Sequence, residues 1–295
     1  MKQQTLTKAY SFEGKGLHLG KHAHMTLLPA PENTGIRFHR TDLGPDAFID
    51  AVASNVSGTA RSTALACGKA SVRTVEHVLS ALTGLGVDNA IIEIDAPEVP
   101  ILDGSARLYA EAISPDGLQE QNAERRWIEL DHEITVPGKN GSYIRITPAE
   151  TLSYDVTIDF NSHVLGVQKV HWELGQDYAT QVAPCRTFCF FHEIRTLALL
   201  GMVKGGDVNN AIVVVEKPVT PAQMRHMARV FNQPLLDVTP QGYLSNLVLR
   251  FPDECGRHKL LDIIGDLRLC GGFLKAHIDA YKPGHTINTK TAKQI

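Results

Sequence analysis

The sequence predicts an α+β fold built as a pair of sandwich domains. Segments typical of strands precede segments typical of helices, and this order occurs twice along the chain. The length of 295 residues suits two domains of ordinary size. A composition of 43% apolar and 21% charged residues is that of a globular protein. We therefore place the first domain at residues 1–120 and the second at residues 125–295.

The first half begins with strand-like residues 1–50, which turns rich in Gly, Pro and Asp interrupt. Thr74–Leu85 carries its apolar residues on one helical stripe and predicts a helix. Asn89–Asp95 predicts a buried strand, and Gly104–Ile113 predicts a second helix. Ser114–Glu124 is polar and contains Pro and Gly, so we interpret it as the linker between the domains.

The second half repeats this order of elements. Three strands are predicted first, at Trp127–Val136, Ser142–Pro148 and Ser153–Phe160. The later elements are helices near Cys189–Leu200, Pro221–Phe231 and Cys255–Leu269, and strands at Ala211–Val215 and His277–Tyr281. Residues 216–250 are irregular and contain proline. We interpret them as an insertion and assign them no role in a site.

Charge and cysteine usage exclude several classes of function. The chain has 29 Lys and Arg against 32 Asp and Glu, a net charge of −3, so bulk charge predicts no nucleic-acid partner. Five cysteines without a C-x-x-C pair argue against a disulfide framework and favour a reducing compartment. The N-terminal residues lack the apolar core of a signal peptide, and no apolar run is long enough to span a bilayer. We expect a cytoplasmic protein without an integral membrane segment.

The strongest chemical signal is Gly256–Asp266, which reads GRHKLLDIIGD. His258, Asp262 and Asp266 are spaced four residues apart, so on a helix they lie along one face. A His and an Asp at this spacing can share one metal ion. The alternative is a surface stripe with an ordinary His–Asp helix pair.

Two further histidines are candidates for such a site. Glu76 and His77 stand together at the start of an apolar helix. They supply the base and the ligand that a hydrolytic zinc site requires, although zinc peptidases use the order H-E. His285 follows a Pro-Gly turn, and we expect it on a rigid loop from which an imidazole can transfer protons. The alternatives are a structural histidine at 77 and an exposed loop histidine at 285.

A structural zinc site is another alternative, and its ligands would be Cys185, Cys189, His192, Cys255 and His258. The tight C-x-x-C knuckles of such sites are missing, and buried free cysteines account for these residues. Nearby, Thr187 offers a hydroxyl that can hold an oxyanion beside a metal. The apolar run Leu197–Val203 precedes a Lys-Gly-Gly turn, and we interpret it as core or, where exposed, as a grip for an acyl chain.

With these segments, the chain resembles the zinc-dependent UDP-3-O-acyl-N-acetylglucosamine deacetylases of lipid A synthesis. The resemblance covers nearly the whole chain. Its motifs are Gly14–Gly20 (GKGLHLG), Arg40–Asp42 (RTD), Thr74–His77 (TVEH), Ala96–Ala106 (APEVPILDGSA), Arg186–Phe188 (RTF), Lys204–Val214 (KGGDVNNAIVV), Arg257–Leu267 (RHKLLDIIGDL) and Gly284–His285 (GH). It implies two domains of similar topology that pack helix layer to helix layer, with the site between them.

The resemblance also assigns the residues of the reaction. It implies one catalytic zinc ion, whose ligands are His77, His258 and Asp262. It implies a general base, Glu76, and a general acid, His285. The expected pH dependence of the rate is bell-shaped, because the base must be ionised and the acid protonated.

Further roles follow from the same resemblance. Asp266 would orient the acid, and Thr187 and Lys259 would lie near the oxyanion and the leaving group. The substrate contacts would be Phe188, Leu200 and Gly206 in an acyl passage within Leu197–Val208, Lys259 and Lys282 at the diphosphate, and Phe160 on the uracil.

The implied reaction is hydrolysis of the acetamide of UDP-3-O-acyl-N-acetylglucosamine, which gives UDP-3-O-acyl-glucosamine and acetate. The alternatives are another zinc amidohydrolase and a non-catalytic domain with structural zinc. A structural site would need a fourth protein ligand, and three are found. We expect a monomer. Because the chain ends ten residues after His285, the front part of a longer, fused polypeptide is the alternative.

Overall fold

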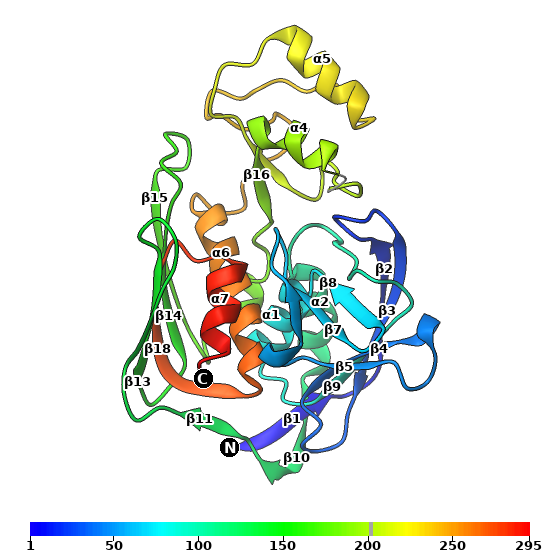
Figure 1. Ribbon diagram of the computed structural model, residues 1–295, viewed down its shortest axis with the longest axis vertical. Helices are drawn as coiled ribbons and strands as arrows, with labels where there is room; N and C mark the ends of the chain where they lie inside the picture. The colour runs from blue at the N-terminus through cyan, green and yellow to red at the C-terminus, as the bar shows by residue number, and fades with distance from the viewer. Residues whose placement is uncertain (201–202) are drawn as a thin grey trace.

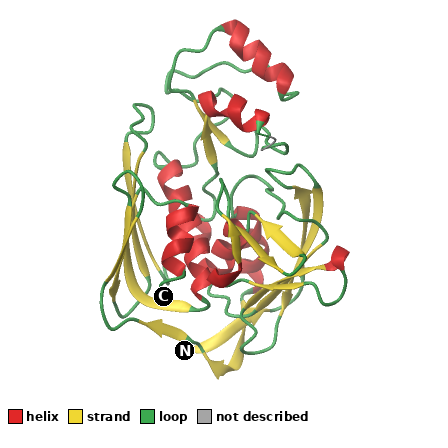
Figure 2. Ribbon diagram, in the orientation of Figure 1, coloured by secondary structure: helices red, strands yellow, loops and turns green. Residues whose placement is uncertain are grey.

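The computed structural model describes residues 1–200 and 203–295, except the side chains of Arg195, Ala198 and Leu199. Two mixed β-sheets form the outer layers, and helices fill the space between them (Figures 1 and 2). One large buried apolar cluster contains residues of both sheets and of these helices. This arrangement confirms the predicted α+β class.

The sheet of the first half buries one face. In spatial order its strands are β2 (Tyr10–Lys15), β3 (His22–Pro29), β9 (Ala90–Ile94), β4 (Ile36–Arg40) and β5 (Phe48–Asp50). Buried residues alternate with more exposed ones along β3, because successive side chains point to opposite faces. The central strand β9 is antiparallel to β3 and parallel to β4. Helix α1 (Glu76–Leu85) precedes β9, and α2 (Arg107–Ile113) follows it.

The sheet of the second half repeats this topology. Its strands in spatial order are β12 (Ile134–Pro137), β13 (Tyr143–Pro148), β18 (Phe273–Tyr281), β14 (Ser153–Asp159) and β15 (Val167–Glu173). The central strand β18 is antiparallel to β13 and parallel to β14, as β9 is to its neighbours. Helix α6 (Glu254–Leu267) precedes β18, and α7 (His285–Ala292) follows it. The two halves therefore have the similar folds that the resemblance implied.

Helices α1 and α6 pack against each other between the sheets. Gly265 makes their close approach possible, because a Cβ atom at this position would lie 2.0 Å from the carbonyl oxygen of Glu76. Helix α7 packs on α6 as well. The contact of α1 with α6 joins the two halves at the residues for which the sequence predicts chemistry.

Smaller elements complete the chain. A three-stranded sheet contains β6 (Val56–Gly58), β7 (Ala64–Cys67) and β8 (Ala70–Arg73). Short helical turns lie at Thr41–Leu43, Ala53–Asn55, Ser114–Asp116, Tyr178–Gln181 (α3) and Arg268–Cys270. Strand β16 (Phe188–Phe190) pairs in parallel with β17 (Ile212–Val214). Helices α4 (Phe191–Leu199) and α5 (Pro221–Val230) extend beyond the two sheets, at the top of Figure 1.

Several segments differ from the prediction. The expected linker contains strand β10 (Leu118–Glu124), which pairs with β1 (Lys2–Leu6). The predicted strand Trp127–Val136 is divided into β11 (Trp127–Glu129), which pairs with β18, and β12. Strand β15 was not predicted. Because β10 spans the boundary that we placed between residues 120 and 125, the two domain ranges stay a proposal.

The end of the chain also differs from expectation. His285 is the first residue of α7 rather than part of a loop, because the extended backbone of Gly284 leads directly into the helix. Within the described parts of the chain, no helix has both the length and the apolar character that crossing a bilayer needs.

Candidate active site

Three potential metal ligands converge where α1 meets α6. His77 lies on α1, and His258 and Asp262 lie one turn apart on α6. Their ligand atoms all lie within 4.8 Å of one another, and all three residues are buried. The Oδ1 atom of Asp262 is 3.4 Å from Nε2 of His258 and 3.9 Å from Nε2 of His77. The structure thus brings together the three residues that the resemblance named as ligands.

The protonation states of these residues suit a metal ion. Burial and the neighbouring His258 lower the pKa of His77 to about 3, and burial also lowers the pKa of His258. Burial alone would raise the pKa of Asp262, but the Lys259 ammonium and the nearby histidines outweigh it and lower that pKa. At neutral pH both rings are therefore neutral and the carboxyl group is ionised. These are the forms that bind divalent metals.

The hydrogen bonds around the ligands also leave atoms free to bind a metal ion. The Nδ1 atom of His258 donates to the carbonyl oxygen of Cys185 at 3.0 Å, which leaves the lone pair on Nε2. The buried Oδ1 of Asp262 has no hydrogen-bond partner among the described residues. A buried carboxylate oxygen without a partner is costly, and a cation would satisfy it. The residues present therefore fit a divalent metal, and three protein ligands are typical of catalytic zinc sites.

The cysteines do not form a competing metal site. Among the described residues, the group of His77, His258 and Asp262 is the one set of His, Cys, Asp and Glu side chains that converges closely enough to hold an ion. Cys185 and Cys255 are buried free thiols, and burial raises the pKa of each. The structure agrees with the simpler interpretation of buried free cysteines.

Glu76 lies directly beside the ligands, at the first position of α1. Its Oε2 atom accepts a hydrogen bond from the backbone N–H of Thr63 at 3.0 Å. Burial raises the pKa of Glu76 to about 8, although the positive charge of His285 opposes the shift. A carboxyl group with this pKa needs further positive charge nearby to act as a base at neutral pH.

His285 approaches the ligands from α7. Its Nε2 atom is 3.9 Å from Oδ2 of Asp262, and its Nδ1 atom is 3.0 Å from Oδ2 of Asp266. Burial alone would lower the pKa of His285, but the carboxylates of Asp266, Glu76 and Asp262 outweigh it and raise that pKa to about 9. The imidazole is therefore cationic at neutral pH and can donate a proton.

Two residues that the sequence analysis missed hold Asp266 in place. The Thr63 hydroxyl donates to Oδ1 of Asp266 at 2.5 Å, and the Asn288 amide donates to Oδ2 at 2.9 Å. Asn288 lies three residues after His285, and this helical spacing is the one sequence signal that could have identified it. Thr63 has no local signal, because only the fold brings it to α6.

Lys259 and Thr187 also lie at the site. The ammonium of Lys259 donates to Oδ2 of Asp262 at 2.6 Å, so it binds the carboxylate of a candidate ligand. Thr187 is half-buried, and its backbone N–H donates to the carbonyl oxygen of Gly104 at 2.7 Å. That contact links the loop before α2 to the strand that carries Phe188.

The candidate ligands and their neighbours line one cleft, which contains side chains from both halves. Glu76, His77, Thr187, His258, Lys259, Asp262 and His285 all line it. Phe160 lies on its edge with 44% of its surface exposed, and its ring packs edge-on against Phe188 and Phe190. Lys282 immediately precedes the lining residue Pro283, and its ammonium pairs with Asp159 at 3.1 Å.

An ion pair that the sequence did not reveal lies at the same cleft. Arg61 and Glu193 both line it, and the guanidinium donates to the two carboxylate oxygens at 2.8 and 3.1 Å. Arg61 belongs to the first half and Glu193 to α4. The pair therefore connects α4 to the first half at the cleft.

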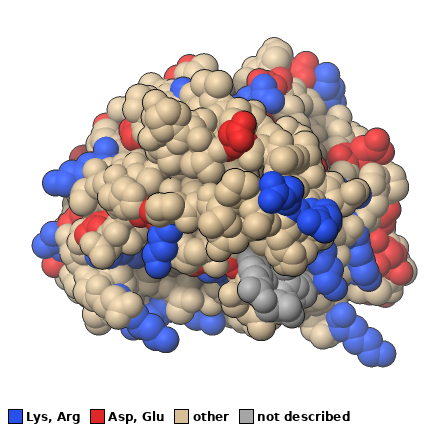
Figure 3. Space-filling view, turned by 90° about the horizontal axis from the view of Figure 1, so that it is seen from above, with Lys and Arg blue, Asp and Glu red and all other residues tan. Residues whose placement is uncertain are grey.

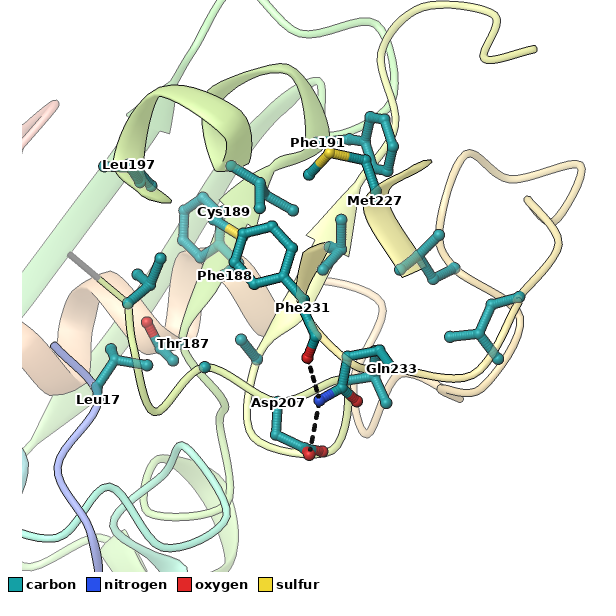
Figure 4. A pocket seen from close by; sticks show the side chains of 18 of the residues that line it. Leu17, Thr187, Phe188, Cys189, Phe191, Leu197, Asp207, Met227, Phe231 and Gln233 are labelled. Atoms are coloured by element: carbon teal, nitrogen blue, oxygen red, sulfur yellow. Dashed lines mark hydrogen bonds between the residues drawn. The ribbon is translucent and has the colours of Figure 1, made fainter. Parts of the chain in front are cut away.

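An apolar cavity of about 150 Å³ continues from the cleft toward α4 and α5 (Figure 4). The two share five lining residues: Leu17, Arg61, Thr187, Phe188 and Cys189. Farther along, the cavity is lined by Leu197, Gly206 and Val208, which belong to the predicted acyl passage. Leu200, which follows the last residue of α4, is 69% exposed and does not line the cavity. Gly201 and Met202 of the predicted apolar run lie outside the described residues.

Known proteins resemble the chain over its whole length. A family model described as UDP-3-O-acyl N-acetylglycosamine deacetylase matches residues 3–239 and 234–295. The UDP-3-O-acyl-N-acetylglucosamine deacetylase of Saccharophagus degradans is 40% identical, over 100% of this chain and 90% of its own length.

Two longer relatives are similar as well. The bifunctional enzyme LpxC/FabZ of Bacteroides thetaiotaomicron is 41% identical and that of Porphyromonas gingivalis 42% identical, each over 100% of this chain. The chain spans 64% of the length of each of these two relatives.

Proposed function

The chain belongs to the family of UDP-3-O-acyl N-acetylglycosamine deacetylases, and we propose that it is a zinc-dependent deacetylase of UDP-3-O-acyl-N-acetylglucosamine. The reaction would hydrolyse the acetamide, with UDP-3-O-acyl-glucosamine and acetate as products, in lipid A biosynthesis. One observation carries this proposal. A buried group of two neutral histidines and one carboxylate lies beside a carboxyl group and a cationic imidazole in a shared cleft.

His77, His258 and Asp262 would hold the metal ion. When bound, a zinc ion would polarise the acetamide carbonyl, lower the pKa of a water molecule and favour the ionised form of Glu76. Lys259 would keep the Asp262 carboxylate ionised and oriented through its hydrogen bond to Oδ2.

Glu76 would act as the general base. Its carboxylate takes a proton from the attacking water, and the N–H of Thr63 fixes the position of Oε2 during this transfer. The Thr187 hydroxyl, which lies in the same cleft, is our candidate for a donor to the developing oxyanion.

His285 would act as the general acid. An amine is a poor leaving group until it is protonated, so the proton on Nε2 of His285 would pass to the amide nitrogen as the C–N bond breaks. Asp266 accepts a hydrogen bond from Nδ1, which directs Nε2 toward the metal ligands and stabilises the cation. Asp266 is therefore a positioning residue.

The apolar cavity and the cleft would bind different parts of the substrate. The apolar cavity that includes Phe188 and Gly206 would hold the 3-O-acyl chain. Phe160 at the edge of the cleft and Lys282 beside it are our candidates for the uracil and the diphosphate. A cytoplasmic location and a monomeric state stay predictions, as does fusion to a second domain, which the bifunctional names of two relatives support.

Metal analysis and an acetate-release assay on the purified chain test this proposal. We expect bound zinc, deacetylation of UDP-3-O-acyl-N-acetylglucosamine and loss of both after chelation. Excess zinc should inhibit by occupying the position of the attacking water. A zinc-loaded chain that releases no acetate from this substrate would contradict the proposed function. Activity that does not depend on the acyl group would instead favour a different zinc amidohydrolase.

A further inference from the structure

We propose that helix α5 forms the outer wall of the acyl cavity and determines which acyl chains the enzyme accepts. Helix α5 lies within residues 216–250, to which the sequence analysis assigned no role in the site. The proposal rests on the proposed function, because it concerns the acyl group of that substrate.

One stripe of α5 faces the cavity. Met224, Met227, Ala228 and Phe231 follow the spacing i, i+3, i+4 and i+7 of one helical face, and all four line the cavity. They are half-buried, whereas Arg225, His226 and Arg229 between them are exposed. Figure 4 shows Met227 and Phe231 around the same cavity as Phe188 and Phe191. The helix therefore presents its apolar face to the cavity and its basic face to solvent.

The opposite wall is formed by β16 and α4. Phe188, Phe191, Ile194 and Leu197 of these elements line the cavity across from α5. On this side, the cavity lies between α5, which is part of the insertion, and the wall that β16 and α4 form. Without α5, this side of the cavity would be open to solvent.

Specific contacts fix α5 in this position. The Gln233 amide donates to Oδ2 of Asp207 at 3.2 Å, a bond that Figure 4 shows, and Asp207 belongs to the turn that carries Gly206. The Asn246 amide donates to the carbonyl oxygen of Val208 at 2.6 Å. At its N-terminus, Thr220 and Gln223 form a reciprocal capping box. The first two contacts join the segment after α5 to residues 207–208 of the cavity lining, and the capping box fixes the start of α5.

A small apolar cluster anchors the inner face of the segment. Val213, Val215 and Leu244 are buried, and Met224 and Leu236 of the insertion pack on them. Beyond this cluster, Met227 and Phe231 project into the cavity. Methionine side chains adapt to irregular shapes, so Met227 is suited to contact chains of somewhat different length or branching.

The outer surface around α5 is largely neutral apart from the exposed basic face of the helix (Figure 3). Figure 3 views the molecule from the end where α4 and α5 lie. Neutral surface covers most of this face, with Lys, Arg, Asp and Glu side chains spread around it.

Kinetics with substrates of graded acyl length test the proposal on the zinc-loaded full chain. Met227→Trp adds volume inside the cavity, and His226→Trp adds the same ring on the exposed face as a matched control. We expect Met227→Trp to lower kcat/KM for long acyl chains by roughly tenfold or more, since a hydrophobic pocket discriminates about 10–200-fold per methylene. The shortest acyl substrate should change by less than about twofold, and His226→Trp should match the wild type. An equal response of both variants at every chain length would overturn the proposal.

A second measurement does not depend on catalysis. A terminally brominated dodecanoate quenches tryptophan fluorescence on contact, so we expect saturable quenching of Met227→Trp well above that of the wild type, which contains Trp127 and Trp172. His226→Trp should show no saturable increase. Equal quenching of the two variants would contradict a chain that contacts α5, whatever the reaction is.

Met227→Ala tests the proposal even if the Met227→Trp variant does not fold. The alanine variant enlarges the cavity, so kcat/KM should shift toward longer or branched acyl chains relative to the wild type. An unchanged preference would contradict the role of α5. A wild-type protein that deacetylates none of the acyl substrates would instead contradict the proposed function. The quenching comparison would still show whether an acyl chain contacts α5.

Discussion

Nδ1 of His285 lies 3.0 Å from Oδ2 of Asp266, a fully buried carboxylate on the neighbouring helix. Asp266 is held in turn by Thr63 and Asn288, so the orientation of the imidazole depends on α6, on α7 and on the loop before β7. The geometry favours the cationic form of His285 and directs its Nε2 toward the metal ligands. The first prediction follows from this hydrogen bond.

Asp266→Asn removes the charge but keeps the shape of the side chain. Burial opposes the protonated form of His285, and Asp266 is the strongest of the groups that raise its pKa to about 9. The variant should therefore lower that pKa. Because the general acid works only while protonated, activity should be lost at a lower pH than in the wild type. The basic limb of the kcat/KM profile against pH measures the shift.

The control for this experiment is Thr289→Ala, which changes a neighbouring hydroxyl that bonds the backbone of α7 and leaves Asp266 intact. Its basic limb should match that of the wild type. A basic limb that stays in place in Asp266→Asn would argue that Asp266 does not act through His285.

Metal content should separate the ligands from the acid and the base. His77→Ala and Asp262→Ala each remove one of three ligands, so zinc content and activity should fall together. Glu76→Gln and His285→Gln should keep zinc and lose about two to four orders of magnitude in kcat. Elemental analysis alongside steady-state kinetics distinguishes the two groups. Full zinc occupancy in both ligand variants would refute the assignment.

The site residues that lie close together in the sequence could be predicted to share a site, and those that lie far apart could not. His258, Asp262 and Asp266 share one helix, so local spacing was enough to place them on one face. Spacing could not join them to His77 or His285, which come from other helices, and the resemblance supplied that connection. Thr63 and the pair of Arg61 with Glu193 had no sequence signal, because their contacts exist only in the folded chain, and Asn288 had only its helical spacing from His285.

The misses in the fold have similar causes. Strand β15 buries Val170 and Trp172, but the exposed residues Lys169 and His171 alternate with them, so its apolar signal is weak. The segment of β10 is polar because it pairs with β1 as a short ribbon with few buried residues. Helix α5 was predicted as an element, but the cavity that its apolar stripe faces depends on β16 and α4.

The contact between α1 and α6 predicts an effect of mutating Gly265. In Gly265→Ala the new Cβ would meet the carbonyl oxygen of Glu76 at 2.0 Å, so the helices must separate. We expect a loss of about 1–3 kcal/mol in the free energy of unfolding, and lower activity because the ligands of the two helices move apart. Gly256→Ala on the same helix is the comparison, since its Cβ would meet side-chain atoms of Gln168 at 3.0 Å rather than a backbone atom at 2.0 Å. Urea denaturation should rank the two, and equal stability would contradict this account.

Asp103 predicts a dependence of stability on pH. Its carboxylate accepts hydrogen bonds from Ser105, Arg107 and, across the chain, Arg250. Burial alone would raise the pKa of Asp103, but the hydrogen bonds from Ser105 and Arg250 outweigh it and lower that pKa. A carboxyl group of this kind stabilises the fold above its unfolded pKa of about 3.9, and the contribution is lost as the pH falls through the lower folded value.

Asp103→Asn should therefore lose about 1–3 kcal/mol in the free energy of unfolding at neutral pH. The difference from the wild type should shrink once the pH falls below the unfolded pKa of about 3.9, where the stabilisation by the carboxylate begins to be lost. Glu111→Gln alters a more exposed partner of Arg107 and should change stability little. A difference between Asp103→Asn and the wild type that is the same at neutral and at acidic pH would rule out the charge as its cause.

The acyl chain should contribute to catalysis through the apolar cavity. Burial of an acyl chain gains about 0.8 kcal/mol per CH₂, so a chain of about ten methylenes supplies several kcal/mol after ordering costs. UDP-N-acetylglucosamine without the acyl group should be a very poor substrate. The loss should fall on kcat/KM, since remote binding energy helps to place the acetamide. Leu197→Gln changes a buried position that lines the cavity. It should reduce the difference in kcat/KM between the two substrates, because it lowers kcat/KM for the acylated substrate alone. Leu200→Gln should not, because Leu200 is exposed outside the cavity. Comparable kcat/KM for acylated and unacylated substrates would refute the acyl role of the cavity and leave the metal chemistry intact.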